Sequence, residues 1–265
     1  MVLQDKNPYT ENIFFIIFPF SLMINKYFFF LLLVFFISAP SLVLGQEHPE
    51  LLKWFDTQIG VENSRLLNGT AYNEPYRIIT SKNNLFNGAT GTGSVFYDGY
   101  WFTDLTMRYN IFDDALIVQL NSRDGLKIVE LVKEKVDRFT LHGSTFANFL
   151  PGTSLDEVKG FHEILLEQGS IALFKKHAQS INVKRDKQVL YYEFEPDEGH
   201  YAFNYNNIIY LIGSRNDLEK IFPQYSKEIK SYYRSNRPLL RSRPDNFYTT
   251  LFRDLGRLED EKRKL

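Results

Sequence analysis

The pattern of apolar and polar positions divides the chain into three parts. Residues 13–24 and 27–45 form two nearly uninterrupted apolar runs, with Lys26 between them. From 76 to 213, short runs rich in Val, Ile, Phe and Tyr alternate with turn residues, which is typical of successive strands. From about 216 onward, apolar residues recur every three or four positions, which indicates helices. The pattern therefore predicts an N-terminal apolar segment, a β-rich body and a helical end.

The second apolar run has the organisation of a signal peptide when the chain is read from Met23. Lys26 provides a basic start, and an apolar core follows it. The run ends on a small residue, Gly45, so we predict cleavage between Gly45 and Gln46. On this interpretation the first 22 residues are not translated.

An uncleaved membrane anchor is the alternative for this segment. Residues 28–44 are almost long enough to span a bilayer, which needs roughly 20 apolar residues. Without cleavage, the protein would contact the membrane only through residues 27–45. In both cases residues 46–265 would lie outside the cytoplasm, in the periplasm or at the cell surface. We expect these residues to form one β-rich domain whose residues 214–265 are helical.

The strands of the body are separated by turn signals. The predicted strands are 76–80, 93–97, 101–109, 115–120, 126–132, 136–142, 161–167, 171–177, 189–195, 201–205 and 208–212. Turns such as Asp98-Gly99 and Glu198-Gly199 are short, and short connections favour antiparallel neighbours. The predicted strands are too many for one flat sheet, because large sheets usually curl or split into two packed layers. The sequence therefore predicts a mainly β (α+β) fold, an antiparallel sandwich or a curved half-barrel with a C-terminal helical region.

Residues 101–109 alternate clearly enough to predict which face is buried. The face predicted to be buried carries Trp101, Thr103, Leu105, Met107 and Tyr109. The opposite face carries Phe102, Asp104, Thr106 and Arg108, and the charged residues there favour solvent.

The helical end is predicted to contain a kink and a linker. Asn216 or Asp217 can cap a helix that begins at 218, and Pro223 kinks it or starts a second helix. A linker at 236–244 then precedes a last helix at 245–260. The apolar stripe of this last helix consists of Phe247, Leu251, Leu255 and Leu258. We expect the stripe to pack on the β body.

Composition excludes several classes of protein. The chain has 265 residues, with 31 Lys and Arg against 32 Asp and Glu, and no Cys. Without cysteine there is no disulfide framework, zinc finger or thiol catalysis. The balanced charge argues against nucleic acid as a partner, because nucleic-acid binders are usually clearly basic.

Motifs for metal or nucleophilic chemistry are missing from the sequence. The five histidines, at 48, 142, 162, 177 and 200, show no metal-ligand spacing, and no Gly-x-Ser-x-Gly elbow occurs. We therefore predict no metal site, no cofactor and no catalytic residue. The carboxylates available for a glycosidase-type pair are Glu163, Glu193, Glu195, Asp197 and Glu198.

Two groups of residues are candidates for binding. The first is aromatic and surrounds the Asp98-Gly99 turn, and aromatic side chains can stack on sugars or anchor a protein partner. It consists of Tyr97, Tyr100, Trp101 and Phe102. The second is a basic cluster, which could attract an acidic polymer or a phosphorylated lipid. It consists of Arg234, Arg237, Arg241 and Arg243, with Lys227, Lys230, Arg253 and Arg257 nearby.

A local pattern also links the chain to a group of proteins. A glycine-led strand and turn precede Met-Arg-Tyr-Asn at 107–110 and an acidic turn at 113–114. The stretches that carry the pattern are 93–118, 136–139 and 161–169. They resemble uncharacterised exported β-rich proteins of Bacteroidetes-type bacteria. The resemblance covers most of 76–260 and implies a β-rich envelope protein, but its motifs carry no catalytic residue.

Together these features predict an exported envelope protein that acts as a non-catalytic binding or structural component. Its expected partner is an envelope protein or glycan, and its oligomeric state stays open. One alternative is a hydrolase that acts on envelope sugars or peptides through a carboxylate pair. Another is a membrane-anchored assembly factor, which requires residues 27–45 to remain attached.

Overall fold

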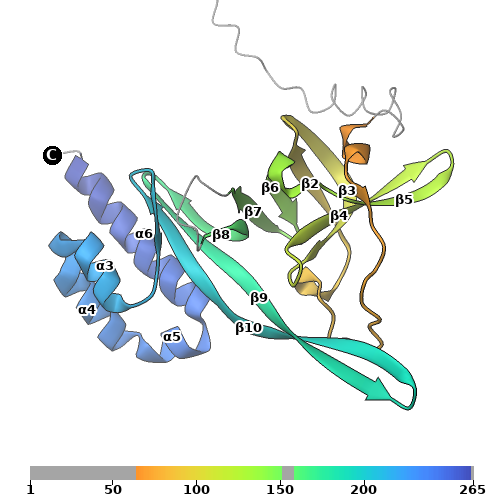
Figure 1. Cartoon of the computed structure of the whole chain (residues 1–265). Helices are drawn as coiled ribbons and strands as arrows, with labels where there is room; N and C mark the ends of the chain where they lie inside the picture. Colours follow the sequence, from red (N-terminus) through yellow and green to blue (C-terminus); the bar gives the residue numbers. More distant parts are fainter. Residues whose placement is uncertain (1–63, 151–157, 264–265) are drawn as a thin grey trace, which may run out of the picture. The chain divides into compact units, whose positions relative to one another are not determined.

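The computed structural model describes residues 64–150 and 158–263, which belong to one compact unit (Figure 1). The segment predicted to be a signal peptide or anchor, 1–45, lies outside the described residues. Within the described ranges, no helix combines the length and the apolar character that crossing a membrane requires.

Eleven strands form one antiparallel sheet in the described part of the chain. They are β1 (Thr70–Ala71), β2 (Gly91–Tyr97), β3 (Tyr100–Asn110), β4 (Ala115–Ser122), β5 (Gly125–Glu130), β6 (Val136–Leu141), β7 (Ser144–Phe149), β8 (Gly160–Gln168), β9 (Ile171–Asp186), β10 (Val189–Tyr205) and β11 (Ile208–Leu211). Their order in the sheet is β1-β5-β4-β3-β2-β6-β7-β8-β9-β10-β11. The predicted mainly β fold with antiparallel strands is confirmed.

The sheet is open and curved, and it is not divided into the two layers of a sandwich. Buried side chains from β2 through β8 meet in one cluster that includes Tyr97, Met107 and Phe139. Strands this far apart in the sheet can share a core only where the sheet bends around it. This part of the structure therefore corresponds to the curved alternative.

Tight turns with positive backbone φ join several neighbouring strands. Both residues of Asp98-Gly99 have positive φ, 52° and 83°, which is the type I′ pattern that fits hairpin twist. Asn206-Asn207 repeats the pattern with 52° and 63°. The Asp98-Gly99 turn was predicted, Asn206-Asn207 lies in the gap between the predicted strands 201–205 and 208–212, and the predicted strand 136–142 ends at the His142-Gly143 turn; the strand β7 that follows this turn was not predicted.

A bulge in β3 corrects the predicted alternation. Met107 and Tyr109 are fully buried, as expected, but Phe102 is only 7 % exposed and Thr103 faces solvent. Asp104 has a φ of 57°, and the β2–β3 register shifts opposite it. One extra residue turns every side chain before it to the other face. The predicted faces are therefore correct after Asp104 and wrong before it.

Strands β9 and β10 form a long hairpin that reaches past the other strands in Figure 1. The predicted strands 189–195 and 201–205 are both parts of β10, so the turn predicted at Glu198-Gly199 is wrong. This site is a bulge within β10, where the register shifts between Asp197 and His200. The segment 76–80 is not a regular strand, but it runs beside β10. Its Arg77 carbonyl accepts a hydrogen bond from the Tyr192 amide at 2.9 Å.

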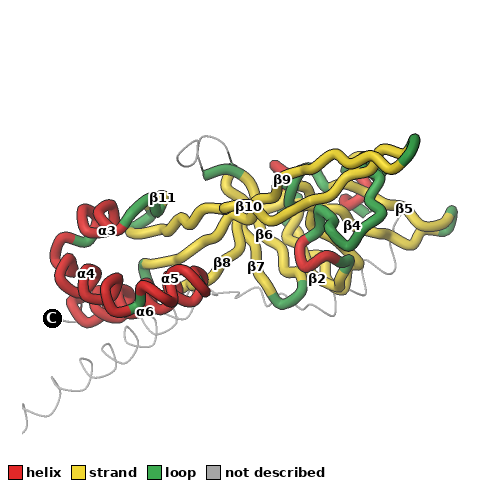
Figure 2. Tube along the Cα trace, turned by 90° about the horizontal axis from the view of Figure 1, so that it is seen from below, coloured by secondary structure: helices red, strands yellow, loops and turns green. Residues whose placement is uncertain are grey.

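Helices gather beside the ends of β8 to β11 (Figure 2). They are α3 (Arg215–Ile221), α4 (Ser226–Ser235), α5 (Arg237–Ser242) and α6 (Pro244–Arg263), and short 3₁₀ turns occur at Arg65–Asn68, Phe86–Gly88, Lys133–Lys135 and Pro223–Tyr225. The predicted linker at 236–244 is wrong, because α5 occupies it and has a proline in its first turn. Ser214, not Asn216 or Asp217, precedes α3, and its hydroxyl donates to Asp217 at 2.7 Å.

The last helix packs on the sheet as predicted. Phe247, Leu251 and Leu255 of α6 are buried in a cluster with Leu173 of β9 and Phe203 of β10. Leu258, the fourth residue of the predicted stripe, is only half-buried and lies outside this cluster. This second core fixes the position of the helical region, because each apolar side chain removed from water contributes about 1.5–3 kcal/mol. The helices that carry the basic cluster are thereby held against the sheet.

Candidate functional site

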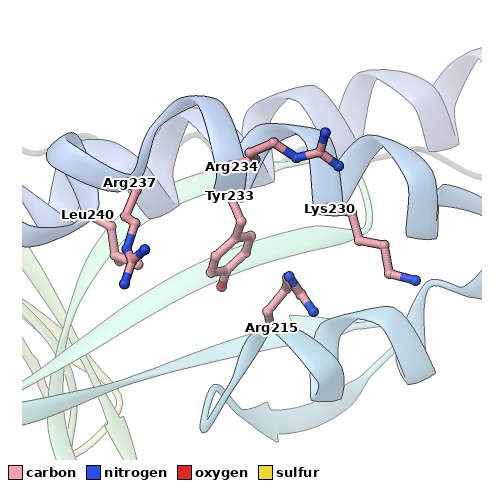
Figure 3. Close-up of a pocket in the computed structure, with 6 residues that line it drawn as sticks. All are labelled: Arg215, Lys230, Tyr233, Arg234, Arg237 and Leu240. Atoms are coloured by element: carbon pink, nitrogen blue, oxygen red, sulfur yellow. The ribbon is translucent and has the colours of Figure 1, made fainter.

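A pocket with a volume of about 470 Å³ lies among α3, α4 and α5 (Figure 3). It is lined by Arg215, Lys230, Tyr233, Arg234, Arg237 and Leu240. Four of these six residues are cations, so the pocket has a strongly positive lining. We call it the cationic pocket.

Helix geometry explains why these side chains meet. Lys230, Tyr233 and Arg234 are three and four residues apart on α4, so they share one face of that helix. The chain folds back at the turn before α4, which brings α3 and its Arg215 beside this face. Ile229 of α4 is fully buried in the second core and anchors the helix from behind.

Tyr233 contributes an aromatic ring and a hydroxyl group to the wall of the pocket. Figure 3 shows Tyr233 and Arg215 pointing toward one another from α4 and α3. The Tyr233 ring packs edge-on against Phe247, with 4.9 Å between ring centroids. Its hydroxyl is buried without a well-formed hydrogen bond. Burial, and then the nearby Tyr248, raise the pKa of Tyr233, so the hydroxyl is a neutral donor at physiological pH.

Glu219 neutralises part of the positive charge. It lies 2.9 Å from Nε of Arg215 and 3.2 Å from Nζ of Lys230. Desolvation would raise the pKa of Glu219, but hydrogen bonds with Lys230 and Ser226 outweigh it and lower that pKa. Glu219 is therefore ionised at neutral pH and holds two of the cations in place.

The remaining two cations of the pocket are not neutralised in this way. Within the described part of the chain, neither Arg234 nor Arg237 has a carboxylate within ion-pair distance. Both residues are solvent-exposed. The pocket therefore keeps an excess of positive charge toward solvent.

The structure separates the predicted arginine cluster into two pairs. Arg234 and Arg237 line the pocket, whereas Arg241 and Arg243 are exposed and outside its lining. Arg215 was not predicted, because it belongs to another helix, far from the cluster in sequence. The Pro223 kink shows that the chain turns there, but it does not show which side chains then meet.

The aromatic candidate surface is smaller than predicted. Tyr97 is fully buried and Phe102 is 7 % exposed, so both belong to the core and not to a surface. Tyr100 is 47 % exposed and carries the Arg65 guanidinium 4.0 Å above its ring. Trp101 is half-buried. The aromatic contact surface thus reduces to Tyr100 and Trp101.

Four of the histidines and carboxylates considered for catalysis meet only in pairs among the described residues. His162 and His200 approach to 3.2 Å, while His177 contacts Glu163 at 2.7 Å. Among the described residues, no three His, Asp or Glu side chains are arranged to hold a metal ion.

Three of the five carboxylates of the hydrolase alternative are engaged in local contacts. Glu163 accepts hydrogen bonds from Ser144 at 2.6 Å and from His177. Glu193 and Glu195 both pair with Lys82, at 3.6 Å and 2.7 Å. Each of these three carboxylates therefore takes part in a hydrogen bond or ion pair within the protein.

No protein-family model matches the chain, and it matches neither a curated protein nor a solved structure. The function is therefore inferred from the chemistry of the pocket itself.

Proposed function

We propose that this protein is an exported envelope component that binds an anionic group in the cationic pocket. The observation that carries the proposal is the set of four cations that, with Tyr233 and Leu240, line a cavity of about 470 Å³. Cavities of about 300–1,000 Å³ are typical of small-molecule sites. In the part of the chain that the structure describes, one carboxylate, Glu219, pairs with two of the four cations, Arg215 and Lys230.

The side chains indicate what the anion is attached to. Arginine guanidinium groups bind phosphate and carboxylate through two parallel hydrogen bonds. The Tyr233 ring and Leu240 add an apolar wall beside the cations. This combination suits a phosphate or carboxylate carried by a sugar-sized organic group, such as an acidic unit of an envelope glycan.

The composition of the pocket favours binding over hydrolysis. Among the described residues that line it, none is a carboxylate, a histidine or a serine. Lys230 and Tyr233 are the lining residues that could act as acid, base or nucleophile, but Lys230 is engaged by Glu219 and the raised pKa of Tyr233 keeps its hydroxyl protonated. The location in the envelope rests on the sequence of residues 27–45.

The first test is a titration calorimetry series on the purified protein. Glucose 1-phosphate and glucuronate represent the two anionic groups, and uncharged glucose is the control ligand. We expect the two anions to bind and glucose not to bind. The affinity is expected to fall as salt rises, because exposed charges are screened. Equal binding of glucose and the anions would contradict the proposal, as would no binding of either anion.

The arginines supply a matched pair of variants. Replacing Arg234 and Arg237 with Gln should weaken anion binding by at least about tenfold, since charge-assisted hydrogen bonds are each worth about 1.5–3 kcal/mol. Replacing Arg241 and Arg243 with Gln removes the same charge outside the pocket and should change affinity less than about twofold. An equal loss in both double variants would show that the anion senses only overall charge.

A further inference from the structure

The far end of the β9–β10 hairpin exposes both apolar and basic side chains. Val183 is 61 % exposed and Leu190 is 42 % exposed. The residues between them include Lys184, Arg185 and Lys187, all exposed, against a single acid, Asp186. We call residues 183–190 the hairpin tip.

The apolar residues of the tip extend an apolar face of the hairpin that Tyr76 covers closer to the sheet. Val183 pairs with Tyr192, and Leu190 pairs with Arg185, so these four side chains share one face of the hairpin. Closer to the sheet, the same face carries Phe194 and Tyr192, and Tyr76 packs on both rings at 5.1 Å and 5.5 Å. The cover ends there, and Val183 and Leu190 lie beyond it.

We propose that the hairpin tip docks on an anionic lipid surface. Val183 and Leu190 would enter the boundary between headgroups and acyl chains, while Arg185 on the same face and Lys187 at the turn would meet lipid phosphates; Lys184 pairs with Tyr191 and lies on the opposite face. Apolar side chains flanked by basic residues are the pattern that binds such surfaces.

The size of the apolar surface favours lipid over a protein partner. A stable protein interface buries about 800 Å² on each partner. Two aliphatic side chains supply only a small part of that area. A lipid surface needs just a shallow apolar insertion when several basic residues add electrostatic attraction. The net positive charge of the tip provides this second contribution.

The absence of cysteine from the sequence permits a residue-specific test on the full chain. Leu190→Cys is labelled with an environment-sensitive fluorophore and mixed with phosphatidylcholine vesicles, or with vesicles that also contain phosphatidylglycerol. Ile208→Cys is the matched control, because Ile208 is a 54 % exposed aliphatic residue at another hairpin. The label reports its own surroundings, so attachment through the N-terminal segment does not imitate the result.

The proposal predicts a blue shift of the label at 190 on vesicles containing phosphatidylglycerol, and none at 208. Adding Arg185→Glu and Lys187→Glu should raise the lipid concentration needed for half of this shift by at least about tenfold. Equal responses at both positions would overturn the proposal, as would a shift that survives charge reversal. A concentration-dependent shift without vesicles would instead assign the tip to a second copy of the chain and would also overturn it.

Discussion

Acidification below pH 6.5 is expected to destabilise this protein by several kcal/mol through one buried histidine. His162 of β8 is fully buried. Its Nδ1 lies 3.1 Å from the Gly160 carbonyl oxygen, which can only accept, so Nδ1 carries the proton. Its Nε2 is then an acceptor that faces His200 Nε2 at 3.2 Å. The site therefore favours the neutral imidazole and disfavours the charged imidazolium, which would be buried away from water.

The expected direction follows from proton binding in the two states. Burial first, with Lys176 and His200 adding to it, lowers the pKa of His162 from 6.5 to about 3, although the Gly160 carbonyl and Asp114 oppose the shift. Between these values the unfolded chain binds a proton that the folded chain does not. The free energy of unfolding therefore falls as pH falls through this window, by roughly 4–5 kcal/mol in all.

Urea unfolding at a series of pH values measures this effect. Between pH 6.5 and 4.5, His162 should account for a loss of about 2.5 kcal/mol. Glutamates of the unfolded chain also begin to bind protons near the lower end of this range, so the contribution of His162 is taken as the difference between the protein and His162→Gln. His162→Gln should flatten the slope in this range, whereas the exposed His142→Gln should leave it unchanged. An unchanged slope in His162→Gln would show that another group causes the acid sensitivity.

The parts of the fold that could be predicted are those that residues close together in the sequence determine. Asp98-Gly99 and Asn206-Asn207 form the expected turns, because Asp, Asn and Gly tolerate the positive φ that a tight hairpin needs. The stripe of α6 packs on the sheet, because its spacing leaves one apolar face. In each case a few adjacent residues determine the structure.

Strand β7 had no comparable local signal. Its Ala147 and Asn148 have low β-propensity, and the strand exists because β6 and β8 pair with its two edges. The Asn148 amide also donates to the carbonyls of Lys133 and Val136, at 2.7 Å and 2.8 Å. These contacts join residues 12 and 15 positions apart, so the β-propensity of residues 144–149 alone does not indicate them.

The same distinction applies to the cationic pocket. Arg234 and Arg237 were predictable, because four arginines within ten residues form a visible cluster. Arg215 and its partner Glu219 join the site only through the packing of α3 beside α4. A sequence shows charge density along the chain, but the distance between helices decides which charges act together.

A second buried polar group should give the largest effect of a single substitution. Asp114, in the turn between β3 and β4, contacts Lys176 at 2.7 Å and Lys133 at 3.1 Å. It also accepts a 2.7 Å hydrogen bond from the Tyr109 hydroxyl. The side chains of Asp114 and Lys176 are only 17 % and 16 % exposed. Asp114 therefore compensates a lysine that has little access to water.

Acid should weaken this network as well, at a lower pH than His162. Desolvation would raise the pKa of Asp114, but Lys176 and Lys133 outweigh it and hold the pKa below its ordinary value of 3.8. A carboxyl with a lowered pKa stabilises the folded state above that ordinary value. The contribution is lost as pH falls through the lower pKa of the folded state.

Asp114→Ala is expected to lower the free energy of unfolding by about 3–5 kcal/mol, because it leaves Lys176 buried without its counter-charge. Glu167→Gln is the control: its ion pair with Arg138 is just as short, at 2.6 Å, but both side chains are at least 40 % exposed. Such an exposed pair should cost no more than about 1 kcal/mol. Urea unfolding at pH 7 measures both values.

Adding Lys176→Met to Asp114→Ala should recover at least about 1 kcal/mol, since it removes the lysine charge that has lost its partner. If it recovers nothing, the loss in Asp114→Ala comes from the missing Tyr109 hydrogen bond, local packing and the strain of alanine at a φ of 53°, not from a buried charge.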